Sequence, residues 1–293
     1  MNFKELGATG VAIPEIGLGT WSYFGGIEPL RAGLDAGALF IDTAESYGSE
    51  EVVGQAIREM RDQVFLATKV SPGHYRYNDV LRAAEGSLRR LNVDCIDLYQ
   101  LHAPNLLVPL AETLAAMEKL VDDGKVRFIG VSNFSARGLK RAQHLLRKHQ
   151  IAANQVRYNL VDRSIEAGLL AHCQAHKITV IAYTPLERGI PRLLAADTRG
   201  ILNSLAAELS KSPAQIALNW CLCQERVVAI PKSNSTTHTV ENCAASGWRL
   251  TSEQVRLLDE RIPFRRRSQL EILARFYMPR RIGGLLRRLL GKA

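Results

Sequence analysis

The sequence contains few of the patterns from which metal and disulfide sites are built. Its five cysteines are an odd number, no pair has CxxC spacing, and no HExxH or HxH arrangement occurs. Cys221 and Cys223 lie two residues apart on an expected helix and therefore point to different faces. We expect reduced cysteines that serve packing, and no metal site. The five are Cys95, Cys173, Cys221, Cys223 and Cys243.

Long apolar runs are missing as well. No stretch approaches the roughly 18 uninterrupted apolar residues that a membrane-spanning helix needs. The N-terminal MNFKELGATG lacks the basic and apolar regions of a signal peptide. With 46% hydrophobic and 23% charged residues, the composition is that of an ordinary globular protein. We therefore expect a cytoplasmic location.

Net positive charge is nearly absent outside the C-terminal tail. The formal net charge is +9, but nine basic residues and one acidic residue fall within 265–293, which leaves a net of +1 for the remainder. Apart from Phe276 and Tyr277, no aromatic residue is interleaved with these basic residues, so nucleic-acid binding is not expected. We divide the chain into a body, residues 1–264, and a basic tail, residues 265–293.

Short β-branched runs alternate with longer amphipathic stretches along the body. A hairpin is expected at Phe3–Leu6 and Val11–Ile16. Eight strands are then expected at Ile16–Thr20, Leu39–Thr43, Val64–Lys69, Cys95–His102, Val126–Ser132, Ala153–Tyr158, Thr179–Thr184 and Val227–Pro231. Helices are expected at Pro29–Ala36, Glu50–Met60, Asn78–Leu91, Leu110–Asp123, Ala136–His149, Ile165–His176, Ile201–Ser210, Pro213–Gln224 and Thr237–Ala245.

Eight strands separated by helices predict an α/β fold, the (β/α)8 TIM barrel, formed by one domain. The alternative is an open doubly wound sheet. That fold usually carries GxGxxG after its first strand, whereas this chain has GLGTWSYFGG there.

Four polar residues come where three successive strands should end. Asp42, Lys69 and His102 occupy these ends, and Tyr47 follows Asp42 by five residues. Chemistry in a (β/α)8 barrel occurs at the carboxyl ends of its strands. A nearby ammonium can lower the tyrosine pKa from its reference of about 10, and a carboxylate can hold that ammonium. A histidine beside the phenol can orient a carbonyl. Any one of these residues alone could equally serve a structural ion pair.

The body resembles the aldo-keto reductases, and most of all the short prokaryotic members, similar to methylglyoxal and 2,5-diketogluconate reductases. The order and spacing of its motifs carry this resemblance: GLGTW, DTAESYGSEEVVG, ATK, DLYQLH, GKVRFIGVSNF, NQVRYN, AYTPL and IPKS. The resemblance implies reduction of small aldehydes and ketones by hydride transfer. Tyr47 would be the general acid, Lys69 held by Asp42 would lower its pKa, and His102 would orient the carbonyl.

The resemblance also implies an NADPH site. Ser132, Asn133 and Gln155 match residues that bind the carboxamide, and Tyr183 matches the aromatic residue that stacks on nicotinamide. Other implied positions are Thr20 and Trp21 after the first strand, Pro185 and Leu186 along the pyrophosphate, Lys232 and Ser233 at the 2′-phosphate, and Glu241 and Asn242 near adenine. Trp21, Tyr47, His102 and Ala103 would form the substrate pocket.

Two positions depart from the family pattern. His238 stands where relatives have an arginine, and histidine carries little charge at pH 7 and has no bidentate fork. We therefore expect a weaker preference for NADPH and some tolerance of NADH. Ala103 stands where relatives often have tryptophan, so we expect a wider pocket. The loops Ala103–Pro109 and Glu187–Gly200 are short, which favours an open site for small carbonyls.

The tail has the pattern of a basic amphipathic helix. Apolar residues at i, i+3, i+4, i+7 and i+8 are Ile282, Leu285, Leu286, Leu289 and Leu290. The tail could bind a membrane surface or another anionic partner, dock on the barrel, or seal an oligomer interface, although we expect a monomer. The alternative function is a catalytically slow, cofactor-binding regulatory subunit that this tail anchors.

Overall fold

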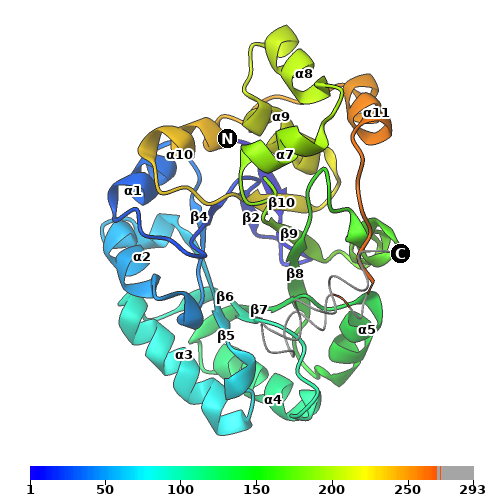
Figure 1. The fold of residues 1–293 in the computed structure, drawn as a ribbon. Coiled ribbons are helices and arrows are strands. Elements are labelled where there is room, and N and C mark those ends of the chain that lie inside the picture. The colour runs from blue at the N-terminus through cyan, green and yellow to red at the C-terminus, as the bar shows by residue number, and fades with distance from the viewer. Residues whose placement is uncertain (269–270, 272–293) are drawn as a thin grey trace, which may run out of the picture.

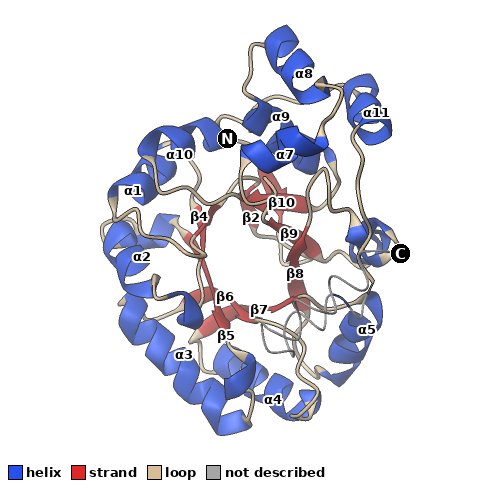
Figure 2. Ribbon diagram, in the orientation of Figure 1, coloured by secondary structure: helices blue, strands red, loops and turns tan. Residues whose placement is uncertain are grey.

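Eight parallel strands surround the centre of the molecule in the computed structural model, which describes residues 1–268 and residue 271 (Figures 1 and 2). They are β3 (Leu18–Gly19), β4 (Phe40–Asp42), β5 (Phe65–Val70), β6 (Ile96–Leu101), β7 (Val126–Ser132), β8 (Ile151–Arg157), β9 (Thr179–Tyr183) and β10 (Val227–Ile230). Each pairs in parallel with the next, and a bridge between Ile16 and Ala229 joins the first to the last. The predicted (β/α)8 barrel is confirmed.

Helices form the outer ring of the barrel (Figure 2). They are α1 (Glu28–Asp35), α2 (Glu50–Ile57), α3 (Tyr77–Leu91), α4 (Leu110–Asp122), α5 (Ala136–Leu145), α6 (Leu169–Ala175), α7 (Ile190–Ala196), α8 (Ile201–Leu209), α9 (Pro213–Cys223), α10 (Thr236–Cys243) and α11 (Ser252–Arg261). In α3, Val80, Ala84, Leu88 and Leu91 are buried, as their spacing predicts.

The interior of the barrel holds a separate apolar cluster, formed by strand residues such as Phe40, Phe65 and Leu98. The hairpin β1 (Phe3–Glu5) and β2 (Ala12–Pro14) contributes Leu6 and Ile13 to the same cluster. Side chains therefore fill the barrel, and the remaining polar strand ends are free to form a site at its rim.

Two predicted helices are changed by features that their periodicity does not reveal. The expected helix Ile165–His176 is divided, because Gly168 adopts a φ of 111° before α6 begins. The helix expected to reach His149 ends at Leu145 instead. Beyond it, the backbone N–H groups of Arg147 and Lys148 donate to the Glu118 carboxylate and not to the preceding helical turn.

Two helices were not predicted. The segment Glu187–Gly200, expected to be a short loop, contains α7 with Pro191 in its first turn. Helix α11 begins with a capping box, in which Thr251 and Gln254 each bond to the other's backbone. The Thr-x-x-Gln pattern in the sequence could have predicted the start of this helix.

None of the helices in the described part of the chain has the length and apolar character that a membrane span requires.

Candidate active site

A buried ion pair forms the floor of the candidate site. Lys69 in β5 donates over 2.6 Å to Oδ2 of Asp42, the last residue of β4, and both side chains are buried. Lys69 also donates to the carbonyl oxygen of Thr43 over 2.7 Å. Burial lowers the pKa of Lys69, but the Asp42 carboxylate more than offsets this and the pKa lies above its usual value. The ammonium is therefore charged at neutral pH.

The other carboxylate oxygen of Asp42 is fixed by two amides. Gln100 in β6 donates to Oδ1 over 3.0 Å, and Gln155 in β8 donates over 2.7 Å. Three strands thus supply hydrogen bonds to one buried carboxylate, which compensates its lost hydration. Gln100 was not among the predicted site residues, and Gln155 was expected to bind the cofactor and not Asp42.

Tyr47 lies above this ion pair. It ends a 3₁₀ helix, Glu45–Tyr47, directly after β4, and the Lys69 ammonium lies 4.8 Å from the centroid of its ring. Burial raises the pKa of Tyr47, and Lys69 opposes this without cancelling it. The pKa of Tyr47 therefore lies above its usual value, and not below it as the resemblance implied. The phenol therefore keeps its proton at neutral pH.

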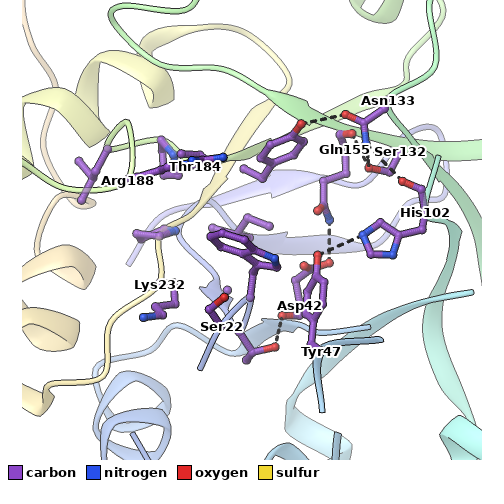
Figure 3. Close-up of a pocket in the computed structure, with 18 of the residues that line it drawn as sticks. Ser22, Asp42, Tyr47, His102, Ser132, Asn133, Gln155, Thr184, Arg188 and Lys232 are labelled. Carbon is purple, nitrogen blue, oxygen red and sulfur yellow. Dashed lines mark hydrogen bonds between the residues drawn. The ribbon is translucent and has the colours of Figure 1, made fainter. Parts of the chain in front are cut away.

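His102 faces Tyr47 from the end of β6. Its Nε2 lies 3.4 Å from Tyr47 Oη, and the two rings are arranged edge to face with centroids 5.4 Å apart (Figure 3). The backbone N–H of His102 donates to Val70 in the neighbouring strand. Both rings therefore present polar atoms to the same point in the cavity.

A second polar group lies beside His102, whose backbone carbonyl accepts a hydrogen bond from the Asn133 side chain over 3.2 Å. The side-chain amide of Asn133 donates to Ser132 Oγ over 2.9 Å and accepts from the Tyr183 hydroxyl over 2.9 Å (Figure 3). Ser132 Oγ in turn donates to the backbone carbonyl of Gln155. Asn133 has a φ of 63°, a conformation that asparagine adopts more readily than most residues. This turn brings its side chain back over the end of β7.

These groups line one cavity of about 470 Å³ at the carboxyl ends of the strands. Its walls also include two cationic side chains, Lys232 and Arg188, on the side away from Tyr47 (Figure 3). The Arg188 guanidinium lies 5.8 Å from the centroid of the Trp21 ring. The cavity thus joins hydroxyl and imidazole groups, an aromatic face and two cations, a combination that fits a nicotinamide dinucleotide. Within the described residues, no cluster of metal-ligating side chains occurs.

Comparison with known proteins identifies the family. Residues 15–262 match the family model described as "Aldo/keto reductase family".

The chain belongs to the aldo/keto reductase family.

Relatives of this reductase with similar sequences are named as carbonyl reductases or as members of the same family. Methylglyoxal reductase YeaE of Escherichia coli is 38% identical over 86% of this chain and 92% of its own length. Glyoxal reductase of Bacillus subtilis is 36% identical, over 85% and 89% respectively. An aldo/keto reductase from Klebsiella pneumoniae, solved with NADP and acetate, superposes with a TM-score of 0.82 at 40% identity, covering 92% and 98%. This chain is therefore an NAD(P)H-dependent oxidoreductase.

The structure brings most of the predicted site residues of this reductase together. Those that line the cavity are Thr20, Trp21, Asp42, Tyr47, His102, Ser132, Asn133, Gln155, Tyr183, Pro185, Leu186 and Lys232. Lys69 lies directly beneath it. Ser233 and Asn242 line a small adjoining cavity, while Glu241 and the exposed His238 lie on α10 outside both.

The prediction that Ala103 lines the substrate pocket is wrong. Its side chain is fully buried, and its backbone N–H and carbonyl both bond to the Tyr75 hydroxyl, over 3.1 and 2.7 Å. A small residue at this position therefore does not widen the cavity directly.

Several cavity residues were not identified from the sequence. They are Gly19, Ser22, Ser46, Thr184, Arg188, Gly189, Ile230 and Pro231. Gly19, Thr184, Ile230 and Pro231 lie within the motifs GLGTW, AYTPL and IPKS, which carried the resemblance to the family. Arg188 follows the seventh barrel strand by only a few residues, and this position at the functional rim of the barrel was its one signal.

Proposed function

We propose that this chain reduces small aldehydes and ketones, including dicarbonyls, with NADPH as the hydride donor and Tyr47 as the proton donor. The observation that carries the proposal is the position of Tyr47, which faces His102 and lies above the Lys69–Asp42 pair. The names of the methylglyoxal and glyoxal reductases among its relatives support the substrate class.

The reaction requires one hydride and one proton. When bound, the reduced nicotinamide supplies the hydride to the carbonyl carbon. Tyr47 donates its phenolic proton to the carbonyl oxygen, so the product is an alcohol. The charged Lys69 stabilises the phenolate that remains, and Asp42 keeps the ammonium in place. His102 donates a hydrogen bond that orients the carbonyl oxygen toward Tyr47.

The remaining polar and aromatic residues of the cavity would hold the cofactor. Asn133, Ser132 and Gln155 present amide and hydroxyl groups suited to a carboxamide, and Tyr183 presents an aromatic face. Lys232 and Arg188 can pair with phosphates. His238 lacks the fork of an arginine, so we propose that NADPH binds less tightly than in a relative with arginine and that NADH also serves.

The direct test of the reduction compares the chain with its Tyr47→Phe variant. The assay follows consumption of NADPH or NADH with methylglyoxal, phenylglyoxal and nitrobenzaldehyde. Loss of the general acid should lower the rate by about 10²- to 10⁴-fold, while NADPH still quenches protein fluorescence with unchanged affinity. If the unmodified chain consumes no cofactor with any carbonyl, the alternative of a catalytically slow regulatory subunit is favoured.

We also propose that the chain acts as a cytoplasmic monomer whose tail contacts anionic surfaces. The helix expected within 282–290 lies outside the described residues, so the sequence pattern alone supports this idea. Co-sedimentation with anionic vesicles should be lost on removal of residues 269–293. The truncation should retain Arg265 and Arg267, because both pair with Asp162 in the barrel. Equal sedimentation of both proteins would contradict the proposal.

A further inference from the structure

A strained loop forms one wall of the cavity. Five residues of the segment 184–189 line it: Thr184, Pro185, Leu186, Arg188 and Gly189. The segment includes three non-glycine residues with positive φ, namely Thr184 at 54°, Glu187 at 46° and Arg188 at 67°. This conformation is unfavourable for residues with a side chain, and especially for the β-branched Thr184. Contacts from outside the loop must therefore hold it in this shape.

Glu187 makes those contacts, on the side away from the cavity. Its carboxylate accepts a hydrogen bond from Asn159 over 2.9 Å and pairs with Arg157. Asn159 also donates to the carbonyl oxygen of Thr184 over 2.9 Å, so one amide holds both ends of the turn. Burial raises the pKa of Glu187, but Arg157 and the other donors more than offset this and hold the pKa below its usual value. Glu187 is therefore charged at neutral pH.

A third cation reaches Glu187 from the C-terminal part of the chain. Arg265 Nη2 lies 3.8 Å from Glu187 Oε1, and Arg265 Nε lies 3.9 Å from Asp162 Oδ2. Asp162 is almost fully buried and also pairs with Arg157 over 3.0 Å and Arg267 over 2.6 Å. Arg265 thus bridges the carboxylate of the cavity loop and a buried carboxylate in the loop that follows β8.

The backbone around Arg265 is fixed to the barrel independently of its side chain. Its N–H donates to Val161 and its carbonyl accepts from Arg163, each over 3.1 Å. The backbone N–H of Arg267 donates to Ser164 Oγ over 2.7 Å. In Figure 1 the chain leaves α11 and runs down the side of the barrel toward α5. The segment 263–268 is therefore a fixed support against which Arg265 can hold the loop.

We propose that the segment 263–268 positions the cavity loop 184–189 through the contact between Arg265 and Glu187, and that this contact strengthens binding of the dinucleotide. Both are positioning residues, since neither lines the cavity. The inference rests on the proposed function for the identity of the ligand. It assigns a role in cofactor binding to a part of the chain that the family motifs do not include.

The test is a charge reversal with a matched control. Arg265→Glu places a third carboxylate beside Glu187 and Asp162, whereas Arg266→Glu makes the same change at the next residue. Arg266 is exposed, and its guanidinium lies 5.2 Å from the centroid of the Phe264 ring. The two variants have the same net charge and the same number of tryptic sites. They differ in the contact with Glu187.

Three readouts are expected to separate the two variants. Arg265→Glu should raise the Kd for NADPH, measured by fluorescence without substrate, roughly tenfold, which corresponds to about 1.4 kcal/mol. In assays its KM for NADPH should rise while kcat at saturating cofactor stays within about twofold. Limited trypsin treatment should cleave the Arg188–Gly189 bond faster. Arg266→Glu should match the unmodified chain in each respect, and Arg265→Lys should restore part of the affinity.

The proposal fails if the two glutamate variants show the same Kd or the same cleavage rate at Arg188. It also fails if Arg265→Glu lowers kcat and kcat/KM by the same factor, because a rise in KM for NADPH would then be absent. If the unmodified chain does not bind NADPH, the proposed function fails instead. The cleavage comparison still decides whether Arg265 positions the loop.

Discussion

The Lys69 ammonium lies 4.8 Å from the centroid of the Tyr47 ring. This relationship connects a buried ion pair to the proposed proton donor, and that role would explain why the ion pair is retained despite its desolvation. Burial keeps the proton on Tyr47 before reaction, while the nearby positive charge stabilises the phenolate afterwards. The two effects act at different stages and do not conflict.

Replacing Asp42 by asparagine should damage both stability and catalysis. Oδ2 accepts from Lys69 and Oδ1 accepts from Gln100 and Gln155, so either orientation of the new amide places its NH₂ against a donor. Loss of one partner of a buried pair costs on the order of 3–5 kcal/mol. Urea unfolding measures this cost. Asp35→Asn, at an exposed position, should be neutral, and equal stability of the two variants would contradict the assignment.

The pH profile should follow the raised pKa of Tyr47. A general acid must be protonated, so reduction is present below this pKa and lost as the pH rises through it. Because the pKa lies above the usual value of about 10, the kcat for reduction should have no tyrosine-dependent decrease between neutral pH and that value. Alcohol oxidation needs the phenolate and should increase with pH. A decrease in reduction near pH 8 that disappears in Tyr47→Phe would contradict this reading.

Replacing His238 by arginine should strengthen NADPH binding. His238 is exposed in the first turn of α10, so an arginine fits without displacing packed atoms. A charged hydrogen bond to the 2′-phosphate is worth about 1.5 kcal/mol at its lower bound, or roughly a tenfold fall in Kd. The Kd for NADH should not change, since NADH has no such phosphate. Thr237→Arg is the control, and an equal gain there would indicate nonspecific attraction.

Replacing Tyr75 by phenylalanine should disturb the residue next to His102. The hydroxyl of Tyr75 bonds to both backbone polar groups of Ala103, and both residues are buried. Leaving these groups unpaired should cost about 1–3 kcal/mol of stability, which thermal unfolding measures. Tyr77→Phe, at a partly exposed tyrosine nearby, should have little effect. A Tyr75→Phe protein as stable as the control would show that Ala103 finds other partners.

The sequence determined the barrel and the polar groups that we propose as catalytic. The period of the apolar residues indicated eight strands and their helices, and each of Asp42, Lys69 and His102 came at a strand end by position alone. The boundaries of some helices could not be predicted, because single residues or tertiary contacts determine where they end. The positive φ of Gly168 divides an expected helix, and the Glu118 carboxylate accepts a hydrogen bond from the backbone N–H of Arg147 beyond α5.

Only the tertiary structure decided how these groups share their partners. Gln100 and Gln155 converge on Asp42 from strands that are far apart in the sequence, and burial of Tyr47 outweighs the effect of Lys69 on its pKa. Likewise, Glu187 and Arg265 are 78 positions apart, and their contact exists only because both segments cross the end of β8. Hydrogen bonds and desolvation depend on distances through space, which residue spacing along the chain does not encode.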